Sequence, residues 1–138
     1  MEGRWRVANT REVYQHIVSE DGFDEAFVLK NQALPFAEYL LGQLEARGMR
    51  RMDLIEALGI DRVYGYQLLN GTRRMSRELL VRTALFLQMD VEGAQRLLRM
   101  GGAACLYARD RQDARVIFAM AKRMPYPRAC RFIWQEGG

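Results

Sequence analysis

Four side chains in one short stretch of the chain have the chemistry that reads the edges of base pairs. If the stretch is helical, their spacing leaves them all pointing outward, and they are Arg62, Tyr66, Gln67 and Asn70. An arginine can donate two hydrogen bonds to guanine, and a glutamine or asparagine can pair in a similar way with adenine. A tyrosine can touch a thymine methyl group or a phosphate. These residue types therefore favour readout in a major groove.

The first element needed to hold these side chains is a short helix over residues 51–58. Leu54, Ile55 and Leu58 fall at a spacing that gives such a helix one apolar stripe. Gly59 follows and ends the helix, because glycine enters the left-handed conformation without a side-chain penalty.

A second helix is expected over residues 61–70. Asp61 is a good N-cap, and Gly71 closes the helix. We expect Val63 and Leu68 to face inward. Two helices joined by so short a turn cross at a steep angle, which is the helix-turn-helix geometry.

The order of turn, cap, glycine and basic exit is similar to the Cro/repressor-type helix-turn-helix family of DNA-binding regulators, the lambda-repressor-like or xenobiotic-response-element group. The resemblance covers residues 35–100, about half of the chain. It is carried by Leu54, Leu58, Gly59, Ile60, Asp61, Leu68, Asn70, Gly71, Thr72, Arg73, Arg74 and Ser76.

The resemblance assigns roles to the polar residues. It implies a sequence-specific transcriptional regulator in which Arg62, Tyr66, Gln67 and Asn70 contact bases. The phosphate contacts, which position a protein without reading sequence, would come from Arg50, Arg51, Thr72, Arg73 and Arg74. It also implies double-stranded DNA as the partner and a homodimer that binds two half-sites. In the competing explanation, Arg50 and Arg51 belong to an ordinary solvated charge cluster. Tyr64 and Tyr66 are then packed aromatic side chains, and Arg62 pairs with Glu56 or Asp61.

Two residues depart from the family pattern. Ile55 stands where the family usually has alanine, so we expect the two helices to pack slightly farther apart. Gly65 stands where it usually has a β-branched residue, and a glycine inside a helix costs about 1 kcal/mol relative to alanine. Either tertiary packing offsets this cost, or Gly65 permits a close approach of backbone to backbone.

The whole chain is expected to be all-α, with a lambda-repressor-like five-helix domain over residues 35–101. Residues 1–34 form a short N-terminal helical arm, which either packs on the main domain or mediates dimerisation. Residues 102–138 form a C-terminal helical extension, and Gly101 with Gly102 marks the boundary. In the extension, Asp110 opens a helix whose inward face is expected to carry Ala114, Ile117, Phe118 and Ala121.

Composition supports an anionic partner. The formal net charge is +4 and 21 residues are basic, of which only Lys30 and Lys122 are lysines. Arginine suits phosphate and guanine edges better than lysine, although a GC-rich genome gives the same bias. The charge is uneven, because the first 30 residues carry four basic and six acidic groups, whereas residues 101–138 carry seven basic and three acidic groups.

Several function classes are not expected. Scattered carboxylates and the single His16 make an enzyme improbable, and we expect neither a metal nor another cofactor. No apolar window is long enough to cross a membrane. Cys105 and Cys130 suit free thiols in a reducing cytoplasm, where we expect the protein to act.

Two alternatives to operator binding remain. The helical domain is a protein-interaction adaptor if it has kept the helix-turn-helix shape without DNA binding, and Gly65 and the apolar ends of the chain favour this. RNA binding through the basic C-terminal segment would want clustered exposed aromatic side chains, which the sequence does not indicate.

Overall fold

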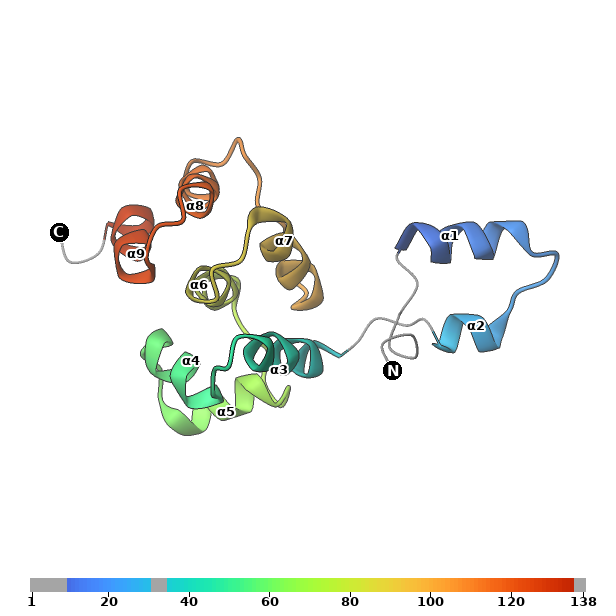
Figure 1. Cartoon of the computed structure of the whole chain (residues 1–138), viewed down its shortest axis with the longest axis horizontal. Coiled ribbons are helices and arrows are strands. Elements are labelled where there is room, and N and C mark those ends of the chain that lie inside the picture. Colours follow the sequence, from blue (N-terminus) through green and yellow to red (C-terminus); the bar gives the residue numbers. More distant parts are fainter. Residues whose placement is uncertain (1–9, 31–34, 136–138) are drawn as a thin grey trace. The chain divides into compact units, whose positions relative to one another are not determined.

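The computed structural model describes residues 10–30 and 35–135, and these residues form nine helices and no strand (Figure 1). The expectation of an all-α chain is therefore confirmed. The helices fall into two compact units, one within residues 1–34 and one within residues 35–138.

The first unit contains α1 (Thr10–Ser19) and α2 (Glu25–Lys30). The His16 ring stacks on Phe27 with 3.6 Å between ring centroids, and its Nε2 lies 3.2 Å from the Asp24 carboxylate. Asp24 also accepts a hydrogen bond from the Phe27 amide. This bond and the one to His16 hold the pKa of Asp24 below its ordinary value. His16 therefore has a structural role in this unit.

The second unit contains seven helices among the residues described: α3 (Phe36–Ala46), α4 (Arg51–Leu58), α5 (Arg62–Leu69), α6 (Arg77–Phe86), α7 (Val91–Met100), α8 (Arg111–Ala121) and α9 (Tyr126–Trp134). Four of them begin after a short polar residue, and for Asp61 and Asp110 the sequence predicts this start. The side chains of Asp61, Ser76, Asp90 and Asp110 each accept a hydrogen bond from the amide three residues later. The short polar residues before the apolar stripes thus set where these helices start.

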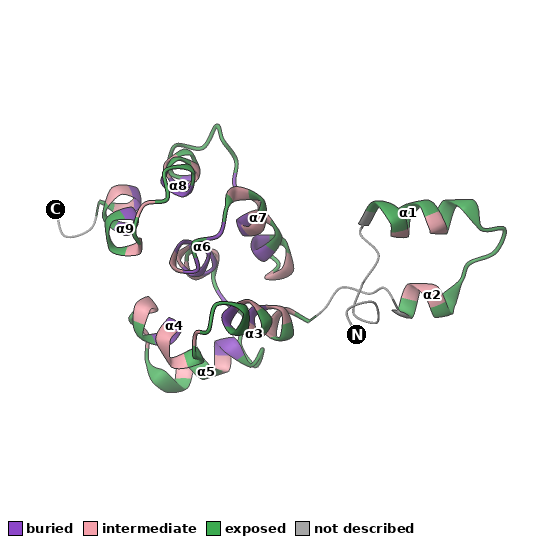
Figure 2. Ribbon diagram, in the orientation of Figure 1, coloured by how far each residue is buried: buried purple, intermediate pink, exposed green. Residues whose placement is uncertain are grey.

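Helix α6 lies at the centre of this unit, where it packs against α4, α7 and α9 (Figure 1). Its buried residues face several sides, as the ribbon coloured by burial shows (Figure 2). Leu80 and Ala84 are completely buried, and the buried Thr83 hydroxyl donates to the Leu79 carbonyl. A helix that is buried nearly all round supports its neighbours on every side, and here those neighbours include α4 of the helix pair.

Residues 102–135 belong to the same compact unit as the helix pair, so Gly101 and Gly102 do not separate two units. Arg77, in the first turn of α6, joins the two parts. It donates to both oxygens of Asp113 in α8, at 3.1 and 2.9 Å, and to the carbonyls of Ala104 and Cys105. Asp113 also accepts from the Tyr107 amide.

The electrostatics of Asp113 follow from this setting. Its burial alone would raise the pKa of the carboxyl. The hydrogen bonds from Arg77 and from the Tyr107 amide outweigh that effect and hold the pKa of Asp113 below its ordinary value. Asp113 is therefore ionised in the folded protein, although it is only 5% exposed.

The expected inward face of α8 is wrong. Ala114, Phe118 and Ala121 are exposed, and Ile117 is half-buried. The buried residues are Asp113, Val116, Ala119 and Met120. A polar residue such as Asp113 is not expected on an inward face, yet its pairing with Arg77 holds this side of α8 inward and leaves Phe118 outward.

The two departures from the family pattern compensate each other. A Cβ atom at Gly65 would lie 2.7 to 2.9 Å from three side-chain carbons of Ile55, and Ile55 is 1% exposed. The expectation that Ile55 holds α4 and α5 farther apart is therefore not needed, because the isoleucine occupies the space that a side chain at position 65 would take. The close approach at Gly65 is made by this side chain rather than by the α4 backbone.

This compensation predicts the outcome of a volume exchange. Ile55→Ala should cost about 2–5 kcal/mol through the cavity it leaves, and Gly65→Val about 1–3 kcal/mol through overpacking. Together they should cost at least about 1 kcal/mol less than their sum, because the valine refills the cavity. Gly42→Val is the matched control, since a Cβ there meets nothing within 4 Å. In denaturant unfolding, the losses in free energy of unfolding caused by Ile55→Ala and Gly42→Val should simply add in the double variant. If the losses caused by Ile55→Ala and Gly65→Val also add fully, the packing of Ile55 against Gly65 is contradicted.

The Arg77–Asp113 ion pair predicts a dependence of stability on pH. Because the folded pKa of Asp113 is lowered, its contribution is complete above the ordinary value and is lost as pH falls through the folded pKa. Asp113→Asn should lower the free energy of unfolding by about 1.5–3 kcal/mol at pH 7. The difference in stability between Asp113→Asn and the unchanged protein should shrink as the pH is lowered from 5 to 2, as thermal melts at each pH can measure. Glu78→Gln, which breaks the more exposed Arg82–Glu78 pair, should cost less than about 1 kcal/mol.

Candidate nucleic-acid interface

Helices α4 and α5 are joined by a turn that fixes their mutual arrangement. Gly59 adopts the left-handed conformation with φ of 67°, and its amide donates to the carbonyls of Ile55 and Glu56. The Asp61 carboxylate then accepts from the Tyr64 amide and starts α5. Leu54 and Leu68 are completely buried. The apolar side chains of the pair therefore anchor it, and the opposite side of α5 is left for polar residues.

The outward side of α5 carries Arg62, Val63, Tyr66 and Asn70, which are all exposed. Val63 is 64% exposed, so the expectation that it faces inward is wrong. An α-helix turns by about 100° per residue, and Val63 precedes the buried Leu68 by five positions, which puts the two on different sides. A periodicity count over Gly65, Leu68 and Leu69, the buried residues of α5, would have identified Val63 as a surface residue.

Arg62 and Gln67 are free of side-chain partners within residues 10–30 and 35–135. Arg62 is exposed and forms no ion pair with Glu56 or Asp61, and the Asp61 carboxylate is engaged as the cap of α5. Gln67 is half-buried, and only its backbone carbonyl is used, by the Arg73 amide at 3.1 Å. Both side chains thus keep their full hydrogen-bonding capacity.

Tyr66 and Asn70 have contacts within the protein. The Tyr66 hydroxyl lies 3.9 Å from the Met52 sulfur, and the tyrosine is still 37% exposed. The Asn70 side-chain oxygen accepts from the Thr72 amide at 2.9 Å. Asn70 therefore shapes the turn after α5, and only its NH₂ group remains to contact another molecule.

The arginines at the start of α4 differ from each other. Arg50 donates to Asp53 at 2.9 Å through its guanidinium and at 2.8 Å through its amide. The hydrogen bonds from Arg50 hold the pKa of Asp53 below its ordinary value, and the same pairing raises the pKa of Arg50. Arg51 is exposed and has no side-chain partner within the described residues. Arg51 is therefore free to pair with another molecule, whereas Arg50 shares its charge with Asp53.

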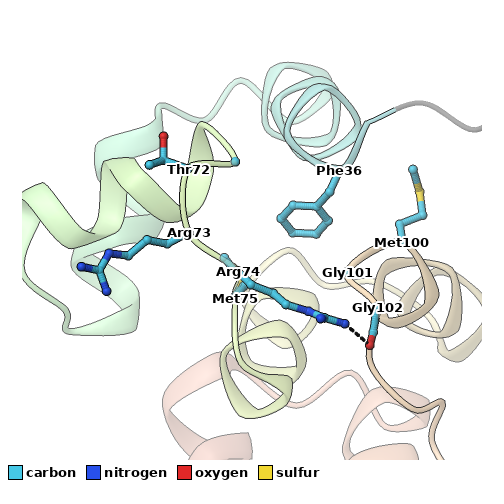
Figure 3. Close-up of a pocket in the computed structure, with 9 residues that line it drawn as sticks. Phe36, Thr72, Arg73, Arg74, Met75, Met100, Gly101 and Gly102 are labelled. Carbon is cyan, nitrogen blue, oxygen red and sulfur yellow. Dashed lines mark hydrogen bonds between the residues drawn. The ribbon is translucent and has the colours of Figure 1, made fainter.

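Two adjacent arginines leave the loop after α5 in opposite directions (Figure 3). Arg73 lies over the ring of Tyr64 in α5, 5.8 Å from its centroid. Arg74 donates to the Gly102 carbonyl at 2.6 Å, beside an open cleft of about 490 Å³ that Phe36, Met75 and Met100 also line. Thr72 is exposed. Thus Arg73 contacts α5, whereas Arg74 connects the loop, through its hydrogen bond, to the residues that follow α7.

We define the α4–α5 surface as Arg51, Arg62, Val63, Tyr66, Gln67 and Arg73, all of which are exposed except the half-buried Gln67. All but Val63 are residues that the sequence predicts as nucleic-acid contacts. Around it, residues 50–74 carry five arginines and three acidic groups. Within the parts of the chain that the structure describes, no helix could span a membrane and no group of three or more potential ligands could hold a metal ion. The surface offers hydrogen-bond donors and acceptors, positive charge and one apolar contact.

Both cysteines are free thiols, with Cys130 buried and Cys105 half-buried.

The chain matches no protein-family model, no curated protein and no solved structure.

Proposed function

We propose that the second unit is a sequence-specific, double-stranded DNA-binding regulator of transcription that acts in the cytoplasm. In this proposal α3 to α7 are the five helices of a lambda-repressor-like domain, and α5 enters the major groove. The observation that carries it is the outward side of α5, where Arg62 is exposed and has no side-chain partner among residues 10–30 and 35–135.

Each side chain of the α4–α5 surface has a definite task in this proposal. Arg62 donates two hydrogen bonds to guanine, and Gln67 pairs with adenine after a change of rotamer. Val63 contacts a thymine methyl group, a role that its exposure suggests and that the sequence did not. A good bidentate pair contributes about 1–3 kcal/mol of discrimination between bases.

The phosphate contacts are divided between the two edges of the surface. Arg51 and Arg73 are the strongest candidates, because both are exposed and free of ion pairs. Arg50 must share its charge with Asp53, and Arg74 must keep its hydrogen bond to Gly102. Thr72 adds a hydroxyl donor. A homodimer that binds two half-sites about one helical turn apart would multiply the modest affinity of one such surface.

A protein-interaction adaptor is the second candidate, and Val63 favours it. An apolar side chain that is 64% exposed next to Tyr66 suits a protein partner as well as a thymine methyl group. The acidic Glu56 and Asp61 are also exposed close by in the sequence, and they would repel phosphates. Experiments with duplex DNA separate the two candidates.

The first experiment selects bound duplexes from a random library and measures their affinity for variants. Arg62→Ala with Gln67→Ala should weaken the selected duplex by at least about thirtyfold, because two base contacts are lost, while affinity for scrambled duplex changes little. The matched control is Arg96→Ala with Gln112→Ala, which removes an exposed arginine and glutamine from α7 and α8. Equal affinity of both double variants for the selected duplex would refute the role given to α5.

The second experiment is a gel shift with duplexes of mixed sequence at low salt. The protein should retard them, because even non-specific binding is visible there. Arg51→Ala with Arg73→Ala should weaken all duplexes alike and reduce the slope of log affinity against log salt by up to about 1.8. Arg96→Ala with Arg99→Ala, also exposed arginines, should leave the slope unchanged. No retardation at all would favour the adaptor, and retardation that survives every α4–α5 variant would place duplex binding elsewhere.

A further inference from the structure

Helices α8 and α9 expose positive charge without exposed negative charge. Residues 111–135 contain one acidic residue, Asp113, which is buried and paired with Arg77. The basic residues of the same stretch are Arg111, Arg115, Lys122, Arg123, Arg128 and Arg131, and all but the half-buried Arg115 are exposed. Within residues 111–135, the ion pair that anchors α8 thus removes the only carboxylate from the surface. The exposed Asp110, which caps α8 next to Arg111, is the one carboxylate described close to it in the sequence.

Four side chains form a stripe along α8. Arg111, Arg115, Phe118 and Lys122 follow one another at steps of four, three and four residues, which places them on one side of a helix. Phe118, in the middle, is 47% exposed. Lys122 lies 5.6 Å from the centroid of the Phe118 ring. The stripe therefore places one accessible aromatic ring between two cations on one side and a third cation on the other.

Helix α9 continues this surface. The Phe132 ring lies 5.7 Å from that of Phe118, and the Arg115 guanidinium lies over Phe132 and donates to its carbonyl. Arg128, one turn before Phe132, and Arg131 are exposed. We call Arg111, Arg115, Phe118, Lys122, Arg128 and Arg131 the α8–α9 surface.

Most cations of this surface have no acidic partner among the described residues. In the part of the chain that the structure describes, Arg111, Lys122, Arg128 and Arg131 form no ion pair. Clustered cations of this kind raise the local concentration of anions and steer them to the surface. A partner with several regularly spaced negative charges would make use of all of them.

We propose that the α8–α9 surface binds single-stranded nucleic acid, with phosphates on the cations and a base stacked on Phe118. Single-strand binding sites combine a basic track for the backbone with aromatic rings for the bases. An acidic protein helix would also satisfy the cations. However, helix docking needs several apolar anchors at helical spacing, and Phe118 is the only large apolar side chain on the stripe. One stacked base needs only one ring.

This inference does not rest on the function proposed for α5. In Figure 1, α8 lies at the far end of the second unit from α5, with α6 between them. The two surfaces can therefore be altered independently. It also revises the expectation from the sequence, which had no exposed aromatic residue in the C-terminal segment to offer to a base.

Fluorescence anisotropy with labelled 15-residue oligo(dT) and oligo(U) at low salt tests the proposal on the full chain. The protein should bind both, with a preference for oligo(U) if the 2′-hydroxyl is contacted. Phe118→Ala and Phe118→Leu should each weaken binding by about five- to hundredfold, whereas Phe118→Trp should hold it within about twofold, because only an aromatic ring stacks. Circular dichroism melts check that the variants fold. We expect them to fold, because the Phe118 side chain is largely exposed and its replacement leaves the core intact.

Charge variants complete the test. Arg111→Glu with Lys122→Glu should abolish binding. Arg96→Glu with Arg99→Glu, which alters net charge equally on α7, should leave at least half of the affinity. Arg62→Ala with Gln67→Ala should bind oligo(dT) normally even if the role of α5 is wrong. Absence of binding at low salt, or binding that Phe118→Leu leaves unchanged, would overturn the proposal; the second result would point to an apolar protein contact.

Discussion

The contact between the Ile55 side chain and the Gly65 backbone is the constraint on which the α4–α5 surface depends. It joins two helices of eight residues each, too short to be stable alone. It also fixes the rotation of α5, because only the side that carries Gly65 can meet Ile55. The opposite side, with Arg62, Val63 and Tyr66, is then turned outward. A polar surface is in this way determined by an apolar contact on the other side of the same helix.

The buried Arg77–Asp113 ion pair has a similar effect on α8. Burying a carboxylate is costly unless it is paired and hydrogen-bonded, and here Arg77 and the Tyr107 amide supply these bonds. Because Asp113 points inward, Phe118 must point outward. The same pair thus anchors the C-terminal helices and determines which residues they show to solvent.

The sequence predicts the starts of helices better than their faces. Asp61 and Asp110 are recognisable as helix starts in the sequence, because capping depends on one side chain and the amide three residues later. The faces of α5 and α8 depend on tertiary partners that no local pattern contains. The apolar character of Val63 and Phe118 predicts inward positions for both. Both are exposed, because a glycine in one helix and an aspartate in the other occupy the inward positions.

For the candidate site too, the sequence indicates the local features but not the contacts between distant residues. The exposure of Arg51, Arg62 and Arg73 follows from their being arginines outside the apolar stripes. The engagement of Arg50 with Asp53 is local and could have been expected from the three-residue spacing. The hydrogen bond of Arg74 joins residues that are 28 positions apart, so nothing near Arg74 in the sequence indicates it.

That last bond makes the C-terminal neighbour part of the α5 exit loop. Gly102 has φ of 75°, a conformation that favours glycine, and a Cβ atom there would displace the Arg74 guanidinium from its present position beside the Gly102 carbonyl. The loop that ends α5 is consequently held by a residue beyond the end of α7. The shortest piece of chain that can keep the exit loop in place therefore extends past residue 102, and an evolutionary exchange of the C-terminal helices would have to preserve this one glycine.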